Sequence, residues 1–263
     1  MEIPLFQVDA FTGEQFRGNP AAVCPLEYWL PAQTMQAVAA ENNLAETAFF
    51  VKEGDRYGLR WFTPATEVDL CGHATLASAY VLFHYMGVQE EAVQFDSRGG
   101  ELQVRRSGEL LVLDFPAHPA QRCEPEQRLI EGLGTQPLEI LRAQYYLVVY
   151  AGIEDILTLQ PKMDVLALVG APCIVTAPGQ DCDFVSRFFA PSYGIDEDPV
   201  TGSAHCTLTP YWSRRLGKKQ MHARQLSARG GELFVEDAGS RVYIAGRVAP
   251  YLRGTITLLG RQK

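Results

Sequence analysis

The feature that most constrains the fold is a repeat that divides the chain into two halves. Arg98-Gly-Gly-Glu-Leu-Gln-Val104 recurs as Arg229-Gly-Gly-Glu-Leu-Phe-Val235, 131 residues further along a chain of 263 residues. A repeat this long does not suit a solenoid or a propeller, so the sequence predicts two similar domains. Three shorter matches keep the same order: Arg60–Pro64 with Arg187–Pro191, Cys71–Ala74 with Thr201–Ala204, and Thr47-Ala48 with Thr176-Ala177.

The two domains are predicted to comprise residues 1–118 and 119–263, each a strand-rich unit wrapped on a helix. Short alternating or β-branched runs, separated by Gly, Pro and Asp, predict the strands. Gly72–Met86 has almost no polar face, which is typical of a helix buried on all sides, as when strands curl around it. Its copy, Gly202–Leu216, is predicted as the second central helix. The last predicted strand, Thr255–Leu259, either stays in the second domain or returns to the first.

Composition and charge limit the kinds of binding partner and the cellular compartment that are expected for this protein. The net charge is −8 and the pI is near 5.2. Such a field repels phosphate backbones and anionic lipid, so neither nucleic acid nor a membrane is expected as a partner. The sequence contains no apolar run of about eighteen residues and no signal-peptide pattern at its start. Six scattered cysteines in a chain of this size indicate reduced thiols and a cytoplasmic protein.

Gly72 and Gly202 occupy equivalent positions, where a loop is predicted to become a helix. The first backbone N–H groups of a helix have no partner within it, and the helix dipole adds partial positive charge there. A glycine at this point lets a ligand approach the backbone closely. If a pseudo-twofold axis relates the halves, the two helix starts face each other across a cleft. This arrangement predicts binding of a small carboxylate.

One difference between the two copies concerns a carboxyl group. Glu46 lies where the second copy has Val175, in a run of residues otherwise suited to burial. Burial disfavours the charged form of a carboxyl group and so favours general acid/base work. The alternative is a glutamate on an edge strand that points to water. In the second half, Asp198 lies four residues before Gly202 and is the acidic residue best placed to enter the cleft.

Four motifs follow one another through both halves: Gly18-Asn-Pro-Ala-Ala-Val23, Asn43-Leu-Ala-Glu-Thr-Ala-Phe49, Cys71-Gly-His-Ala-Thr75 and Asp198-Pro-Val-Thr-Gly-Ser-Ala204. In these motifs the chain resembles the PhzF-like proteins of phenazine biosynthesis, which are relatives of diaminopimelate epimerase. The resemblance implies an α+β fold of the diaminopimelate-epimerase type. Two duplicated β-barrel-like domains, each around a central helix, are related by a pseudo-twofold axis in such a fold and hold the site between them. It also implies a homodimer.

The resemblance implies a reaction and the residues that perform it. In the phenazine enzyme, trans-2,3-dihydro-3-hydroxyanthranilate is isomerised by moving a proton, without a metal or an organic cofactor. The glutamate of the second motif transfers that proton, which implies that Glu46 is the catalytic acid/base, assisted by His73 and Asp198. A small carboxylate-bearing substrate is expected to be bound by a further set of residues: Asn19, Cys71, Gly72, Thr201, Gly202 and Ser203.

Other functions use some of the same residues. Diaminopimelate epimerase and proline racemase use two cysteines as paired bases, whereas here Cys71 is matched by Thr201, whose hydroxyl is far too weak an acid for that exchange. An epimerase of an amino or hydroxy acid, based on one thiol or on Glu46, has the same pocket. A non-catalytic member that binds a small molecule or a protein is the third possibility. The spacing of Cys and His predicts no metal site, and no Gly-rich nucleotide-binding loop occurs.

Overall fold

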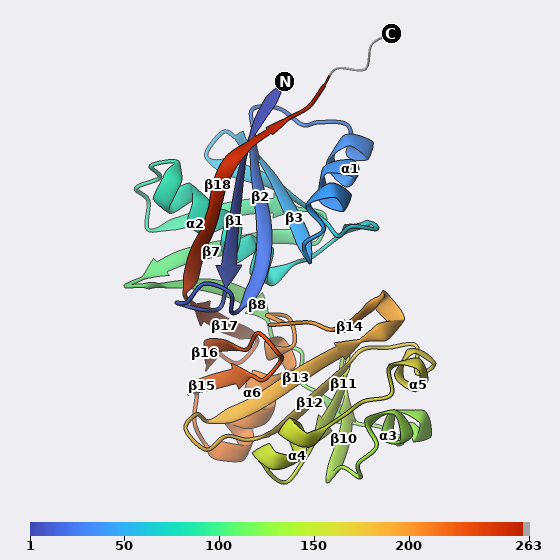
Figure 1. Cartoon of the computed structure of the whole chain (residues 1–263). Coiled ribbons are helices and arrows are strands. Elements are labelled where there is room, and N and C mark those ends of the chain that lie inside the picture. Colours follow the sequence, from blue (N-terminus) through green and yellow to red (C-terminus); the bar gives the residue numbers. More distant parts are fainter. Residues whose placement is uncertain (260–263) are drawn as a thin grey trace. The chain divides into compact units, whose positions relative to one another are not determined.

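The computed structural model describes residues 1–259, and these fall into two compact units. The first unit comprises Met1–Asp114 and the segment that begins at Ala245, and the second comprises Phe115–Ile244. Both units are built mainly of strands with few helices, the α+β composition expected from the sequence (Figure 1). Among the described residues, none of the helices is both long enough and apolar enough to cross a membrane.

The first unit contains two helices, α1 (Ala32–Asn42) and α2 (Gly72–Tyr85). Its strands are β1 (Glu2–Ala10), β2 (Asn19–Leu26), β3 (Glu46–Glu53), β4 (Arg56–Phe62), β5 (Glu67–Val68), β6 (Ala92–Ser97), β7 (Gly100–Ser107), β8 (Leu110–Pro116) and β18 (Val248–Thr257). The chain pairs β1 with β2 antiparallel, β2 with β3 parallel, and β3 with β4 antiparallel. Helix α2 then carries the chain to β6, which is parallel to β4 and antiparallel to β7.

The second unit contains the helices α3 (Gln127–Leu133), α4 (Ile153–Thr158), α5 (Met163–Ala167) and α6 (His205–Leu216), and the short 3₁₀ helix η1 (Pro191–Tyr193). Its strands are β9 (Gln121–Arg122), β10 (Glu139–Arg142), β11 (Tyr146–Val149), β12 (Cys173–Pro178), β13 (Phe184–Ala190), β14 (Ile195–Glu197), β15 (Gln220–Gln225), β16 (Gly231–Asp237) and β17 (Arg241–Gly246). The pairing repeats the first unit: β10–β11 antiparallel, β11–β12 parallel, β12–β13 antiparallel, β13–β15 parallel and β15–β16 antiparallel. This shared order is what a duplicated chain produces.

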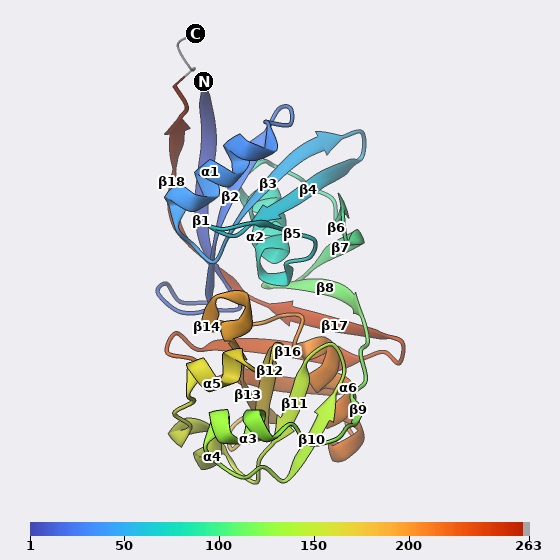
Figure 2. The ribbon, with the colours of Figure 1, turned by 90° about the vertical axis from the view of Figure 1, so that its right-hand side faces the viewer.

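Helix α2 forms the centre of the first unit. Every residue from Gly72 to Phe83 except Tyr80 is buried, and the helix contacts β1, β2, β3, β7 and β18. Figures 1 and 2 show strands around this helix in both views. The prediction of a helix buried on all sides is therefore confirmed. The burial fixes the position of the first turn of α2, which carries the residues discussed below.

Two element boundaries differ from those predicted. The last strand is β18, which begins at Val248 rather than Thr255 and pairs antiparallel with β1. It therefore returns to the first unit, which was one of the two possibilities left open by the sequence. Helix α6 begins at His205 rather than Gly202. Residues 202–204 form a tighter turn, because the N–H groups of His205 and Cys206 donate to the carbonyls three residues earlier, at 3.0 and 3.2 Å.

Each unit contains an ion pair between the arginine that begins the repeated Arg-x-Phe-x-Pro segment and a glutamate that follows the segment. In the first, Arg60 on β4 donates from two nitrogens to the carboxylate of Glu67 on β5, at 2.7 and 2.8 Å. In the second, Arg187 on β13 donates in the same way to Glu197 on β14, at 2.7 and 2.9 Å. Both pairs hold the short strand that precedes the central helix, which explains why both copies retain the arginine.

Candidate active site

Four polar side chains from three segments of the first unit meet at the start of α2. Nε2 of His73 lies 3.1 Å from Oε2 of Glu46. Nδ1 of the same ring lies 3.3 Å from Nδ2 of Asn19 and 3.5 Å from Sγ of Cys71. The imidazole therefore lies between a carboxylate on one side and an amide with a thiol on the other. These are three of the four motifs named above, now placed in contact by the fold.

Local backbone structure places each of these side chains. Glu46 is the first residue of β3, in parallel register with Ala21 of β2, while Cys71 precedes α2 and His73 lies in its first turn. Asn19 begins β2 and follows Gly18, whose φ is +65°. A Cβ at Gly18 would lie 2.2 Å from the carbonyl oxygen of Ala10. Only glycine, which has no Cβ, avoids this clash. The chain is thus tightly constrained just before Asn19.

The cluster is almost closed to solvent. The side chains of His73 and Glu46 expose 6% and 13% of their surface, and Asn19 is fully buried. Oε2 of Glu46 and Nε2 of His73 are buried without a hydrogen bond, although they face each other at 3.1 Å. Buried polar atoms normally have hydrogen-bond partners. The exceptions here indicate a site with unused capacity for a ligand or a proton.

The surroundings of His73 and Cys71 alter their acidity. Burial on its own lowers the pKa of His73, but the neighbouring Cys71 and Glu46 raise it, and the balance lies well above the ordinary value. For Cys71, burial raises the pKa of the thiol and the charge of Glu46 raises it further, which outweighs the opposing effect of His73. The raised pKa of Cys71 means that its thiol stays protonated near neutral pH.

Glu46, Cys71 and His73 each place one possible metal-ligand atom within 4.8 Å of the others. The two ring nitrogens of His73 face different neighbours, however, with Cys71 at Nδ1 and Glu46 at Nε2. One ion can take only one nitrogen of an imidazole. The side chains as arranged therefore surround the ring rather than converge on a common point, which fits proton transfer better than metal binding.

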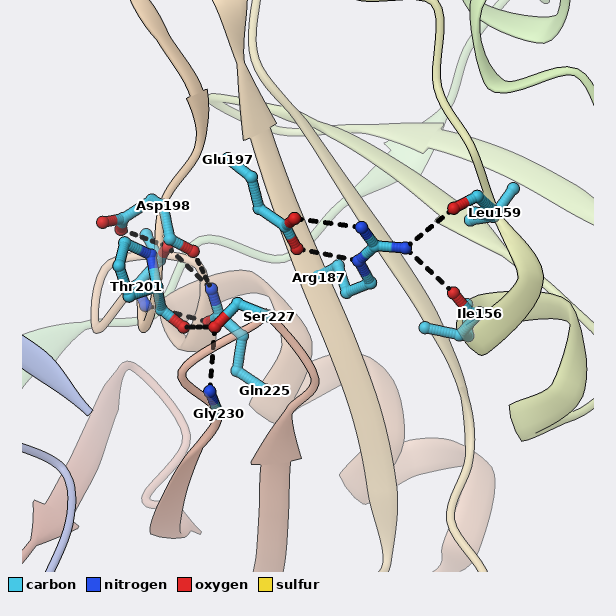
Figure 3. Close-up of polar contacts among 10 residues, drawn as sticks. Ile156, Leu159, Arg187, Glu197, Asp198, Thr201, Gln225, Ser227 and Gly230 are labelled. Carbon is cyan, nitrogen blue, oxygen red and sulfur yellow. Dashed lines mark hydrogen bonds and ion pairs between the residues drawn. The ribbon is translucent and has the colours of Figure 1, made fainter. Parts of the chain in front are cut away.

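In the second unit, Asp198 and Thr201 belong to one hydrogen-bond network with Gln225 of β15 (Figure 3). Oγ1 of Thr201 donates to Oδ2 of Asp198. The Gln225 amide donates to the carbonyl of Asp198 at 2.8 Å and accepts from N of Thr201 at 2.8 Å. Ser227 adds a bond from its hydroxyl to the carbonyl of Pro199 at 2.8 Å. These hydrogen bonds therefore fix the loop before α6 to β15 and the residues that follow it, and the Thr201 hydroxyl is used as a donor to Asp198.

Ser203 and His205 follow in the turn that leads into α6. The hydroxyls of Ser203 and Tyr145 lie 3.4 Å apart, close enough for a weak hydrogen bond. Nδ1 of His205 lies 2.9 Å from the carbonyl oxygen of Thr201. In the first unit, Thr75 occupies the equivalent position and donates to the carbonyl of Cys71 at 2.6 Å. His205 thus has the same structural role as Thr75, tying the helix start to the preceding loop.

The burial of His205 predicts a loss of stability in acid. Burial lowers the pKa of His205 to about 4, against an ordinary value of 6.5, and the bond to the Thr201 carbonyl opposes this only in part. The unfolded chain therefore takes up a proton at a pH where the native protein does not. The associated stability is complete above pH 6.5 and is lost as the pH falls toward 4, by up to about 3 kcal/mol.

Urea unfolding at pH 7 and at about pH 4.5 measures this loss in the wild type and in His205→Gln. The variant keeps a side chain that donates to the Thr201 carbonyl but no longer titrates. Its free energy of unfolding is expected to fall less between the two pH values. An equal fall in both proteins shows that His205 is not the group responsible.

Sequence reasoning missed two residues of these networks. Gln225 is 1% exposed, and it shares the buried face of β15 with Met221 and Ala223. That alternation was the available signal, since a glutamine at an apolar position of a strand needs partners. Tyr145 precedes β11 and contacts Ser203 across 58 residues of sequence, and nothing in the local sequence indicates that contact.

The structure leaves the predicted site residues in two groups. Glu46, His73, Cys71 and Asn19 are in contact in the first unit, with Gly72 at the first position of α2. The second group lies in the loop and turn before α6 of the second unit: Asp198, Thr201, Gly202 and Ser203.

Comparisons with known proteins identify a family and support the fold. A family model described as "Phenazine biosynthesis-like protein" (PhzC-PhzF) matches residues 8–254. A Pseudomonas aeruginosa protein, named as an uncharacterized isomerase, is 51% identical over 261 residues, which cover 98% of this chain and 100% of that protein. The crystal structure of a PhzF family protein from Enterococcus faecalis is 46% identical and superposes with a TM-score of 0.96, covering 98% of this chain and 100% of that one.

A more distant structure extends the likeness of fold. A probable proline racemase from Agrobacterium radiobacter superposes with a TM-score of 0.65 at 12% identity, over 99% of this chain and 94% of that one. The fold class expected from the sequence is confirmed, and so is the resemblance carried by the four motifs. The chain belongs to the phenazine biosynthesis-like (PhzC-PhzF) family.

Proposed function

We propose that the protein is a cofactor-independent isomerase that moves a proton on a small carboxylate-bearing substrate, with Glu46 as the general acid/base. The observation that carries the proposal is the nearly buried Glu46 carboxylate, whose Oε2 faces Nε2 of His73 at 3.1 Å while neither atom has a hydrogen bond. A base that takes a proton from carbon must be positioned and sheltered from water. Glu46 satisfies both conditions, since its side chain is 13% exposed.

The first turn of α2 supplies the matching anion site. The backbone N–H groups of Gly72, His73 and Ala74 precede the first intrahelical bond, which Thr75 makes to the carbonyl of Cys71 at 3.1 Å. Such groups and the helix dipole favour a carboxylate. His73 in this turn contacts Glu46. A substrate held here by its acid group would therefore have a neighbouring C–H close to the Glu46 carboxylate.

The proposed reaction removes one proton from the substrate and adds one proton to it. The Glu46 carboxylate takes a proton from a substrate carbon, and the electron pair of that C–H bond passes into the adjoining unsaturated system. The resulting carboxylic acid exchanges its O–H proton with solvent and then delivers a proton to a different carbon. No oxidant, reductant or group-transfer partner is consumed. Support for an isomerase also comes from the Pseudomonas aeruginosa relative, whose name includes that activity.

Epimerisation of an amino or hydroxy acid is a second candidate, because it begins with the same proton abstraction. Superposition on a probable proline racemase is evidence of fold alone at 12% identity. A two-thiol exchange is disfavoured because the second repeat has Thr201 at the position equivalent to Cys71. The Thr201 hydroxyl also donates a hydrogen bond to Asp198. An epimerase of this kind therefore relies on Glu46 or on Cys71 alone.

Substitution of Cys71 tests the single-thiol form of the epimerase. Because its thiol is protonated near neutral pH, Cys71→Ala is expected to lower the rate by less than about tenfold, below the contribution of a general base. The rate is measured on the substrate identified by deuterium exchange, with Cys173→Ala, another buried cysteine, as the matched control. A loss of about 10³-fold or more in Cys71→Ala alone would support a single-thiol epimerase.

The experiment that tests the proposal is exchange of a pool of small carboxylic acids in deuterated water, read by mass spectrometry and NMR. Isomerisation predicts deuterium at a new carbon together with a shifted double bond. Epimerisation predicts deuterium at the original stereocentre with inversion. The sequence prediction that Asp198, Gly202 and Ser203 contact the same substrate stays a prediction, which reduced affinity in Ser203→Ala would support.

A further inference from the structure

A second pocket of the first unit lies away from the candidate active site. It has a volume of about 430 Å³, a size typical of sites for small molecules. Its charged and aromatic lining residues are Tyr80, His84, Arg106, Glu109 and Arg247, all of the first unit. Tyr80 and His84 follow the first turn of α2 by about two and three turns. Within residues 1–259, the pocket shares no lining residue with the candidate active site.

Arg106 of this pocket is a half-buried arginine without an acidic partner. Its Nη2 donates to the carbonyl of Val88, and its guanidinium lies over the ring of Phe83, 4.1 Å from the centroid. Its Nε is buried without a hydrogen bond, and among residues 1–259 no carboxylate forms an ion pair with it. The half-buried Arg60 and Arg187 each have a glutamate partner. Because a charge removed from water is normally paired, Arg106 favours an anion in the pocket.

Arg247 has an acidic partner that a ligand can replace. Its Nε lies 3.4 Å from Oε2 of Glu109, and the two side chains are 39% and 84% exposed. Exposed pairs of this kind contribute little to stability. A carboxylate on a ligand can therefore take the place of Glu109 beside Arg247 at little cost. The pocket thus offers two guanidinium groups, against one carboxylate that can turn away to water.

Tyr80 and His84 give the pocket an aromatic wall. Their rings are stacked, with centroids 4.0 Å apart and planes inclined by 19°. Nδ1 of His84 lies 3.1 Å from the carbonyl oxygen of Tyr80, which holds the imidazole beside the phenol. Aromatic faces attract other planar rings, and guanidinium groups match the planar carboxylate in shape and charge. An aromatic carboxylate combines the two features that this lining recognises.

We propose that this pocket is a binding site for a small aromatic carboxylate, with the acid group on Arg106 and Arg247 and the ring against Tyr80 and His84. Without the ligand, Glu109 is a partner of Arg247, and the bound carboxylate displaces it. The site is additional to the one at the start of α2. Its existence does not depend on the proposed function, because it needs no residue that contacts the isomerase substrate.

Titration of the full-length protein with benzoate, followed by nitrogen-15 NMR of the imidazole rings, tests the proposal. The chain has five histidines, and the spectrum of His84→Gln assigns the signal of His84. Benzoate is expected to shift this signal saturably, with a Kd of about 1 mM or below. Benzamide, which lacks the charge, and acetate, which lacks the ring, are expected to bind at least about tenfold more weakly. A His84 signal that does not move, or equal binding of either comparison compound, overturns the proposal.

Two substitutions are expected to change the benzoate affinity in opposite directions. Arg106→Met weakens binding by about tenfold or more, because it removes a charged hydrogen-bond donor. Glu109→Gln strengthens binding by up to about fivefold, because it removes the competing carboxylate. Arg105→Met is the matched control, since Arg105 precedes Arg106 on β7 and its side chain points to the opposite face.

Thermal melts show whether each variant is folded, and Arg247→Met replaces Arg106→Met should the latter not fold. The proposal predicts weaker binding in the folded arginine variant and tighter binding in Glu109→Gln, with Arg105→Met unchanged. Unchanged affinity in the arginine variant, or weaker binding in Glu109→Gln, contradicts it. A shift of the His73 signal alone would place benzoate at the candidate active site and would also overturn the second site.

Discussion

Glu46→Gln is expected to lower turnover by about 10² to 10⁴-fold, the usual contribution of a general acid/base, while the protein stays folded. Glutamine has the same shape as glutamate but cannot accept a proton from carbon. Its amide can still lie beside His73 at the start of β3, so the melting temperature and ligand affinity are expected to change little. The measurement is the steady-state rate together with a thermal melt and a binding titration of the same variant.

The control for this substitution is Glu41→Gln, which removes an exposed carboxyl near the end of α1 in the same unit. Its rate and melting temperature should match those of the wild type. Turnover retained in Glu46→Gln would remove Glu46 from the role of base. An unfolded Glu46→Gln protein would instead make the carboxylate part of the structural core, in conflict with its unsatisfied Oε2.

Arg187→Leu is expected to cost about 3 kcal/mol or more in the free energy of unfolding, the range found when one partner of a buried ion pair is removed. Arg187 and Glu197 expose 14% and 20% of their side chains, so the remaining carboxylate is poorly solvated. Arg187 also donates to the carbonyls of Ile156 and Leu159, at 3.2 and 3.1 Å (Figure 3). The substitution removes all of these bonds together, because one side chain makes them all.

Urea unfolding of Arg187→Leu and of Arg224→Leu makes the comparison direct. Arg224 pairs with Asp181, but the two side chains are 41% and 70% exposed, and exposed pairs contribute at most about 1 kcal/mol. Equal losses in the two variants would show that Arg187 stabilises no more than an ordinary surface charge.

Internal repetition made much of the fold predictable. The repeated segments indicated two similar units, and the structure shows the same order of parallel and antiparallel pairs in each. The apolar residues of α2 predicted its complete burial, because a helix without a polar face has nowhere else to go. The path of β18 was left open, since its pairing with β1 joins residues about 250 positions apart and depends on tertiary structure that no local pattern records.

The candidate site was only partly readable. Glu46 stood out because its repeat partner is Val175, and the structure places its carboxylate 3.1 Å from Nε2 of His73. The contact between Asn19 and His73 was not readable, because it joins residues 54 positions apart in the sequence. Gln225 was missed for a similar reason: its bonds to Asp198 and Thr201 cross from a strand to a loop that lies more than twenty residues earlier.

The most direct test of the account compares wild type, Glu46→Gln and Glu41→Gln in deuterated water with the carboxylic acid that wild type labels. The account predicts that wild type and Glu41→Gln place one deuteron on a substrate carbon at the same rate, and that Glu46→Gln places almost none. Deuterium entering at the wild-type rate in folded Glu46→Gln would contradict proton transfer by Glu46.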